Sequence, residues 1–155
     1  MGEVFGIVPA APRSLIFLAA IVLLLLAILT MLGYFAYSSQ ATRFELREEG
    51  LAIRRTLYGR TIAWSSLRLD EATAVNLHDS PELRPTMRTN GIGLPGYGAG
   101  WFRLRGGRGL LFVTDRSRIV AIPTTEGYTL MISVADPEHF LARLRSSGRT
   151  ADRTL

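Results

Sequence analysis

Residues 15–37 read LIFLAAIVLLLLAILTMLGYFAY, a stretch of 23 residues without a charged side chain. As an α-helix this stretch would be about 34 Å long, at roughly 1.5 Å per residue, which is enough to cross the hydrocarbon core of a bilayer. Leu, Ile, Val and Phe fill 14 of its positions, so insertion into a bilayer is favourable by an amount on the order of several kcal/mol. The sequence therefore predicts one transmembrane helix, at residues 14–38, after a short N-terminal tail at residues 1–13.

The flanks of this stretch fit a helix that spans the bilayer and stays in the protein. Pro9 and Pro12 prevent the helix from extending upstream, and Tyr34 and Tyr37 lie where aromatic residues contact the membrane interface. A cleaved signal peptide is one alternative, because SQA at residues 39–41 resembles a cleavage site. The apolar part of a signal peptide is typically about 7 to 15 residues long, which is shorter than this stretch. A buried helix is the other alternative, but a small domain cannot surround a helix that is apolar on every face.

Arginines near the two ends of the stretch predict its orientation. Arg13 lies upstream, whereas Arg43, Arg47, Arg54 and Arg55 follow within about 20 residues downstream. The end of a span with more basic residues tends to stay in the cytoplasm. We therefore expect a single-pass protein of the cell membrane whose C-terminal domain is cytoplasmic.

Composition limits what the rest of the chain can be. The residues after the helix, roughly 110, leave room for one domain of ordinary size. The absence of cysteine excludes disulfides, thiolate metal sites and thiol nucleophiles. All 18 basic residues are arginine, and the formal net charge is +5. Arginine suits the recognition of phosphates or carboxylates and a positive charge suits an anionic membrane surface, although a bias of the coding sequence also explains this composition.

Alternating apolar residues after residue 40 predict β-structure. Residues 44–53 alternate on both sides of the turn EEG at residues 48–50, which predicts a β-hairpin. A second hairpin is expected over residues 101–113, because Gly106 and Gly107 suit a tight turn. The strands expected in the domain are residues 44–46, 51–53, 60–64, 72–77, 101–104, 110–113, 118–122 and 128–132.

The last element is predicted to be a helix. Asp136 is a good N-cap and Pro137 suits the first helical position. Phe140, Leu141 and Leu144 recur at helical spacing. This single apolar stripe must cover something, and the open end of a small barrel is the natural place for it.

Three stretches of the sequence resemble the bacterial pleckstrin-homology-like (PH-like) domains. They are TRFELREEGLAIRRTLYGRTIAW at residues 42–64, RTNGIGLPGYGAGWFRL at residues 88–104 and LLFVTDRSRIVAIPTTEGYTLMISVADPEHFLARL at residues 110–144. The resemblance implies a mainly β domain at residues 42–147, a PH-like sandwich or barrel of about seven strands with one C-terminal helix, and a flexible tail at residues 148–155. It also implies a binding or scaffolding module.

The first hairpin loop differs from that of the PH domains that bind phosphoinositides. Those eukaryotic domains crowd basic residues into this loop, whereas here it is short and acidic, EEG at residues 48–50. Arg54 and Arg55 follow on the second strand, but adjacent residues of a strand point to opposite faces. Specific recognition of inositol phosphates is therefore not expected.

Residues 78–100 are rich in Gly and Pro and are expected to form a long loop, which is often a functional feature. GIGLPG at residues 91–96 matches the GxGxxG pattern of dinucleotide sites, but Pro95 and the strand-like residues that follow exclude the helix such a site requires. The loop forms either an exposed lip that binds an anion or a peptide, or a cover over the core, and we favour the cover. The lip would consist of Arg84, Arg88, Asn90 and Tyr97. The cover would consist of Leu94, Tyr97 and Trp101.

The sequence offers no complete catalytic or metal-binding set. Neither of its two histidines, His78 and His139, lies in a pattern with a nucleophile and a carboxylate. Asp70 and Glu71 are expected to end a strand or cap a turn. We therefore expect no enzyme activity, no cofactor, no metal, no nucleic acid and no small-molecule substrate.

These features predict a non-catalytic interaction or scaffolding module, anchored in the bilayer by the N-terminal helix. Its expected partner is another membrane protein or a second copy of the chain. The alternative function is the sensing of anionic lipid head groups by Arg54, Arg55, Arg103, Arg105 and Arg108. A third possibility is an enzyme whose active site lies in the Gly-rich loop near His78. The candidate interaction residues are Arg54, Arg55, Arg84, Arg88, Asn90, Tyr97, Arg103, Arg105 and Arg108.

Overall fold

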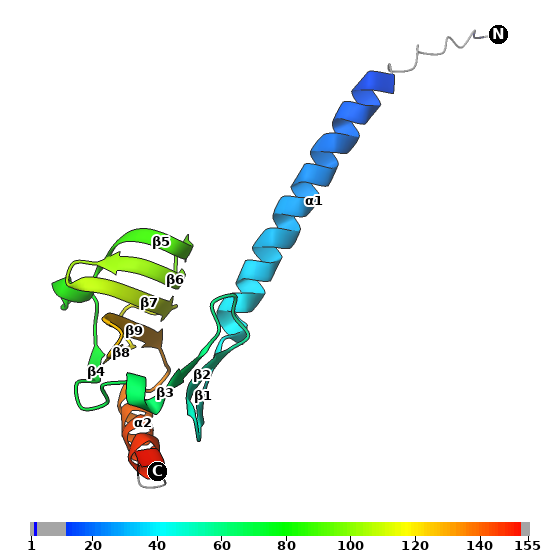
Figure 1. The fold of residues 1–155 in the computed structure, drawn as a ribbon. Helices are drawn as coiled ribbons and strands as arrows, with labels where there is room; N and C mark the ends of the chain where they lie inside the picture. The colour runs from blue at the N-terminus through cyan, green and yellow to red at the C-terminus, as the bar shows by residue number, and fades with distance from the viewer. Residues whose placement is uncertain (1, 3–11, 153–155) are drawn as a thin grey trace. The chain divides into compact units, whose positions relative to one another are not determined.

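A computed structural model describes residue 2 and residues 12–152 of the chain (Figure 1). The chain divides into two compact units, and the boundary lies between Gln40 and Ala41. Residues 12–40 of the first unit are helical, and the second unit contains all the described strands.

Helix α1 (Pro12–Ala41) begins in the first unit and ends at the first residue of the second. Its segment Arg13–Tyr34 has a mean hydropathy of 3.2, and none of this segment is buried. Thr30 is a polar residue within it, and its hydroxyl donates a hydrogen bond to the carbonyl oxygen of Leu26 at 2.8 Å, so the hydroxyl needs no water. The helix predicted at residues 14–38 is confirmed, and it is long and apolar enough to span a membrane.

The second unit is mainly β, as predicted, with two sheets and the C-terminal helix α2 (Pro137–Asp152). The three-stranded sheet contains, in spatial order, β1 (Arg43–Arg47), β2 (Gly50–Arg54) and β3 (Thr61–Ala63). The six-stranded sheet contains, in spatial order, β4 (Thr73–Val75), β8 (Ile119–Pro123), β9 (Tyr128–Ser133), β7 (Gly107–Val113), β6 (Tyr97–Leu104) and β5 (Pro85–Leu94). Short 3₁₀-helices, η1 (Trp64–Ser66) and η2 (Pro81–Leu83), follow β3 and β4. The described part of the chain thus has nine strands, whereas the sequence pattern predicts eight and the resemblance implies about seven. All neighbouring strands are antiparallel except β7 and β9.

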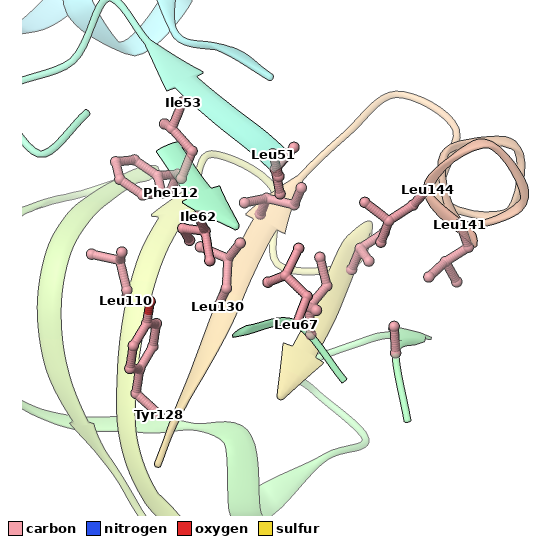
Figure 2. Close-up of a cluster of buried hydrophobic side chains, with 14 of the residues drawn as sticks. Leu51, Ile53, Ile62, Leu67, Leu110, Phe112, Tyr128, Leu130, Leu141 and Leu144 are labelled. Atoms are coloured by element: carbon pink, nitrogen blue, oxygen red, sulfur yellow. The ribbon is translucent and has the colours of Figure 1, made fainter. Parts of the chain in front are cut away.

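The main core lies between the two sheets and α2 (Figure 2). Strands β2 and β3 contribute Leu51, Ile53 and Ile62, which are almost completely buried. Burial of each such side chain is worth about 1.5–3 kcal/mol. The residues that meet them from the six-stranded sheet and α2 include Leu110, Phe112, Leu130, Ile132, Leu141 and Leu144.

A second apolar cluster lies on the opposite face of the six-stranded sheet. Alternate residues of β7 divide between the two clusters, with Leu110 and Phe112 in the main core and Leu111 and Val113 in the second. Leu83 of η2 packs against this second cluster. Because residues 110–113 of β7 are buried on both faces, their sequence LLFV is a continuous apolar run instead of an alternating one.

The first predicted hairpin is confirmed as β1 and β2. Arg47 is paired with Gly50, so the acidic turn is as short as the sequence indicates. The indole Nε1 of Trp64 donates to the carbonyl oxygens of Arg47 and Glu48, both at 3.0 Å. Gly50 is buried against β3, and a Cβ atom at this position would lie 2.0 Å from the carbonyl oxygen of Ile62. The Trp64 side chain and strand β3 therefore hold this turn in place.

The second predicted hairpin is confirmed as β6 and β7, with its turn shifted by one residue. Leu104 is paired with Gly107, so Arg105 and Gly106 form the turn in place of the expected pair Gly106-Gly107. The four strands expected outside the hairpins are found as β3, β4, β8 and β9, with bounds that differ by at most two residues.

The long loop predicted at residues 78–100 is wrong, because most of this stretch forms β5 and the start of β6. Strand β5 has two register irregularities relative to β6. Next to them, the Thr86 and Thr89 hydroxyls donate to the carbonyl oxygens of Arg103 at 3.0 Å and Trp101 at 3.1 Å. Pairing with β6 thus builds a strand from residues whose own pattern does not alternate.

Helix α2 begins as predicted. The Asp136 carboxylate accepts a hydrogen bond from the backbone N–H of His139 at 3.0 Å, which confirms the N-cap. Arg145 connects the helix to the segment before β4, because its Nη2 donates to the carbonyl oxygen of Ala72 at 2.7 Å.

The flexible tail predicted at residues 148–155 is wrong for residues 148–152, which continue α2. Gly148 is buried, and a Cβ atom there would lie only 2.1 Å from Cδ1 of Leu69. This packing keeps the backbone helical beyond the point at which a glycine ordinarily ends a helix. Residues 153–155 lie outside the described residues.

Replacing Gly50 with alanine is expected to destabilise the second unit by more than about 2 kcal/mol, since the new methyl group would clash with the Ile62 carbonyl. Urea unfolding of the full chain in detergent, followed by tryptophan fluorescence, measures this effect, because Trp64 and Trp101 both lie in the second unit. Gly93→Ala is the control, because its nearest neighbours would be 3.8 Å or more from the new Cβ. Equal destabilisation by the two substitutions would contradict this account.

Candidate interaction surface

Trp101 on β6 is the centre of a cluster of aromatic and basic side chains. The Cζ atoms of Arg60 and Arg108 each lie 5.2 Å from the centroid of the Trp101 ring, within the range of a cation–π interaction. Tyr128 meets the same ring edge-on, with 5.0 Å between centroids and an interplanar angle of 76°. We call Arg60, Trp101, Arg108 and Tyr128 the arginine–tryptophan cluster.

The six-stranded sheet holds three members of this cluster in place. Arg108 at the start of β7 pairs with Tyr128 at the start of β9. Tyr128 is buried and belongs to the main core, where it lies at one side of the apolar residues in Figure 2. Trp101 is half-buried and packs against the same core. The ring of Trp101 is therefore held rigidly and stays partly open to solvent.

Arg60 reaches the cluster through the connection between β2 and β3. The backbone N–H of Ile53 donates to the carbonyl oxygen of Arg60 at 2.8 Å. The hydroxyl of Tyr58 donates to Oδ1 of Asn90 on β5 at 3.3 Å. Gly100 has a φ of 108°, and a Cβ atom there would lie 3.0 Å from the Tyr58 ring. The connection thus lies against β5 and β6, and glycine at position 100 permits this approach.

Within residues 12–152, the arginines of the cluster form no ion pair with a carboxylate. Burial raises the pKa of Tyr128, the charge of Glu126 raises it further and Arg60 lowers it. The Tyr128 hydroxyl is therefore neutral at physiological pH. The ion pairs found in residues 12–152 are Arg47–Glu45, Arg68–Glu71 and Arg118–Asp115. Neither Arg60 nor Arg108 takes part in any of them.

The structure brings several of the predicted arginines side by side. Arg103 and Arg108 are opposite each other on β6 and β7, and both are exposed. Arg54 at the end of β2 is opposite Arg43 on β1. Arg55 follows with a φ of 59° and is exposed. Like charges directly opposite one another destabilise a sheet, and a bound anion would remove this penalty.

Other predicted arginines lie elsewhere in the fold. Arg84 is used structurally, because its Nε donates to the carbonyl oxygen of Leu77 at 2.9 Å and its Nη2 donates to that of His78. Arg88 is exposed on β5, and Arg105 is exposed in the turn between β6 and β7. Arg84 therefore holds the connection between β4 and β5 and is not a free binding group.

The structure favours the predicted cover over the predicted lip. Tyr97 is only 8% exposed and belongs to the main core, so it is not part of an exposed lip. Trp101 also packs against the core, as the cover requires. Leu94 does not, because it is 42% exposed. Asn90, expected in the lip, instead accepts the hydrogen bond from Tyr58.

The two histidines lie apart from the cluster. His139 is exposed on α2. His78 lines a shallow cavity of about 240 Å³ together with Leu77, Arg84, Pro85 and Arg116. Neither Asn90 nor Tyr97 of the Gly-rich stretch lines this cavity. Among residues 2 and 12–152, no group of three or more His, Cys, Asp or Glu side chains is placed to hold a metal ion.

The sequence alone does not single out Tyr58, Arg60 and Tyr128 as residues of this surface. The sequence predicts Arg60 only as the start of a strand. Its partner Trp101 is 41 residues further along the chain. No local pattern links the two residues, since their contact depends on how the small sheet packs on the large one.

Comparison with known proteins identifies the family of the second unit. A family model described as "Bacterial PH domain" matches residues 42–148. No curated protein and no solved structure matches the chain. The match covers more than half of the sequence and includes the nine described strands and most of α2. The chain therefore belongs to the bacterial PH domain family.

Proposed function

We propose that this chain is a single-pass membrane protein whose bacterial PH domain is a non-catalytic interaction module at the cytoplasmic face of the cell membrane. The observation that carries the proposal is α1, whose segment Arg13–Tyr34 is long, apolar and completely unburied. Exposure of so many large apolar side chains to water is unfavourable. A bilayer is the environment that suits this helix.

The domain itself does not need α1 for its core. Both apolar clusters consist entirely of residues from the second unit. The described core of the domain is thus formed without the apolar side chains of α1. This supports a membrane anchor over the alternative of a buried helix.

The proposed orientation follows from the arginines that flank α1. Arg13 precedes the apolar segment, and Arg43, Arg47 and Arg54 are on the first two strands after it. Basic residues close to a span favour the cytoplasmic side. The domain would therefore face the cytoplasm, where anionic lipid head groups attract its positive charge.

Attachment of the domain to the membrane would allow it to bind a partner through weak contacts. A domain held at the membrane surface has a high effective concentration for any partner in the same membrane. The proposed partner is another membrane protein or a second copy of the chain.

Strand β5 is the edge through which such a partner would bind. It is ten residues long, lies at one end of the six-stranded sheet and pairs only with β6 (Figure 1). Its register irregularities lie before Asn90, and from there to Leu94 the pairing is regular. Met87 and Leu94 on this strand are 53% and 42% exposed. An open edge with exposed apolar side chains can accept a further strand.

Binding of anionic lipid head groups is a second candidate function. It is favoured by Arg103 and Arg108, which are adjacent and exposed on the β6–β7 hairpin. The turn of the first hairpin, with Glu48 and Glu49, remains acidic. Such binding would therefore use charge on the β6–β7 hairpin.

Single-cysteine labelling is expected to show a spanning helix with a cytoplasmic domain. The chain has no cysteine, so Gly2→Cys and Ser146→Cys each introduce one reactive site at an exposed position. A membrane-impermeant maleimide should label Gly2→Cys in right-side-out vesicles and Ser146→Cys in inverted vesicles. Detergent should allow labelling of both variants in both preparations. Labelling of both sites from the same side would contradict the spanning helix.

Lysine substitution of the exposed apolar residues on β5 is expected to weaken self-association or partner capture. The double variant Met87→Lys and Leu94→Lys places charges along the edge, which disfavours addition of a strand. Crosslinking in native membranes measures the effect, and the unfolding midpoint should change little. Leu57→Lys is the matched control, because Leu57 is an exposed apolar residue outside β5. An unchanged crosslinking pattern in the double variant would exclude β5 as the contact.

The lipid function predicts salt-sensitive binding to anionic vesicles. The full chain in phosphatidylcholine nanodiscs should co-sediment with large vesicles that contain phosphatidylserine, and less so at high salt, which screens exposed charges. The double variant Arg103→Gln and Arg108→Gln should reduce this binding more than Arg68→Gln combined with Arg118→Gln. Absence of co-sedimentation at low salt would exclude the binding of anionic lipid head groups as a function of this chain.

A further inference from the structure

We infer that the arginine–tryptophan cluster binds an acidic segment of a partner protein, with carboxylates on Arg60 and Arg108 and an apolar side chain on the Trp101 ring. This inference rests on the proposed interaction function and names the chemistry of the partner. It concerns a different surface from the β5 edge.

The two guanidinium groups are already placed for such a ligand. Each Cζ lies 5.2 Å from the same Trp101 centroid, so the two atoms are at most twice that distance apart. In an extended segment, side chains two residues apart are about 7 Å apart and point the same way. Acidic residues at positions i and i+2 can therefore reach both arginines. Because Trp101 restrains both side chains, little further side-chain entropy is lost on binding.

The positive charge of this surface favours an anionic ligand. Arg60 and Arg108 have no carboxylate partner among the described residues. Arg103 lies directly opposite Arg108 and adds a third positive charge. Glu126 is the acidic residue whose charge acts on Tyr128 of the cluster. Incoming carboxylates would relieve the repulsion between the arginines and form charge-assisted hydrogen bonds with them.

The shape of the surface favours a protein segment over a small ligand. Small-molecule sites are concave, and neither the cavity beside His78 nor the one beside Glu82 and Arg105 is lined by a residue of the cluster. A half-buried Trp flanked by Arg is the composition of energetically important protein interfaces. A lipid head group would use the positive charge but not the indole. The indole therefore points to a partner with an apolar side chain on the same face of the segment as its acidic ones, for example at position i+4.

Peptide binding to the full chain tests this inference. The probe is a fluorescein-labelled peptide with glutamate at positions i and i+2, phenylalanine at position i+4 and glycine between them, so that all three side chains share one face of the extended chain. It is added to the chain in phosphatidylcholine nanodiscs at low salt. The matched peptide with glutamine in place of glutamate should bind at least about tenfold more weakly. Arg60→Gln and Arg108→Gln should each weaken binding of the acidic peptide by about tenfold. Trp101→Phe should weaken both peptides, and Glu126→Gln should strengthen binding of the acidic one.

Arg88→Gln is the matched control, because it removes the same charge from an exposed arginine outside the cluster. It should change the affinity by less than about twofold. Tryptophan fluorescence should show that Arg60→Gln and Arg108→Gln remain folded. If Arg88→Gln weakened binding of the acidic peptide as much as Arg60→Gln and Arg108→Gln do, the binding would be due to general charge attraction. That result would overturn the inference.

Two other outcomes would also overturn it. One is the absence of binding by the acidic peptide at low salt. The other is binding only to phosphatidylserine vesicles with the same dependence on Arg60 and Arg108, which would assign the cluster to lipid head groups. Failure of the peptide experiment leaves the labelling and crosslinking results intact, so it can be distinguished from failure of the proposed function.

Discussion

Apolar side chains of the small sheet pack into one face of the large sheet, and the positions of the other elements of the domain depend on this contact. Leu51, Ile53 and Ile62 are buried there, and α2 completes the same layer with Leu141 and Leu144. The backbone of Ile53 also binds the carbonyl oxygen of Arg60. The core contact therefore determines where the β2–β3 connection runs, and through it which surface arginine reaches Trp101.

The burial of the apolar residues leaves a domain whose outside is rich in arginine. Three arginines of the described residues form ion pairs with carboxylates. Others, such as Arg103 and Arg108, are cross-strand neighbours of like charge. Electrostatic attraction at physiological salt extends only about 8 Å, so these charges act on partners that are already close. The proposed membrane anchor would supply such closeness, because it would keep the domain beside lipids and other membrane proteins.

Elements with a local physical cause were predictable from the sequence. The turn of the first hairpin follows from EEG at residues 48–50, and the start of α2 follows from Asp136, whose carboxylate caps the helix. Strand β5 was not predictable, because its glycines and irregular pattern become a strand only through pairing with β6. The extension of α2 past Gly148 likewise depends on contact with Leu69, far away in the sequence.

The sequence by itself determined that the chain has one long apolar helix, a mainly β domain after it and no cysteine chemistry, since these follow from composition and from the period of the apolar residues. The sequence also identified arginines as candidate binding residues. It did not reveal which of them, such as Arg84, have a structural role through hydrogen bonds to the backbone. Only the tertiary structure decided that Arg60, Trp101 and Arg108 meet. The physical reason is that this contact joins segments on different sheets, and the packing of those sheets is set by the whole core and not by any local pattern.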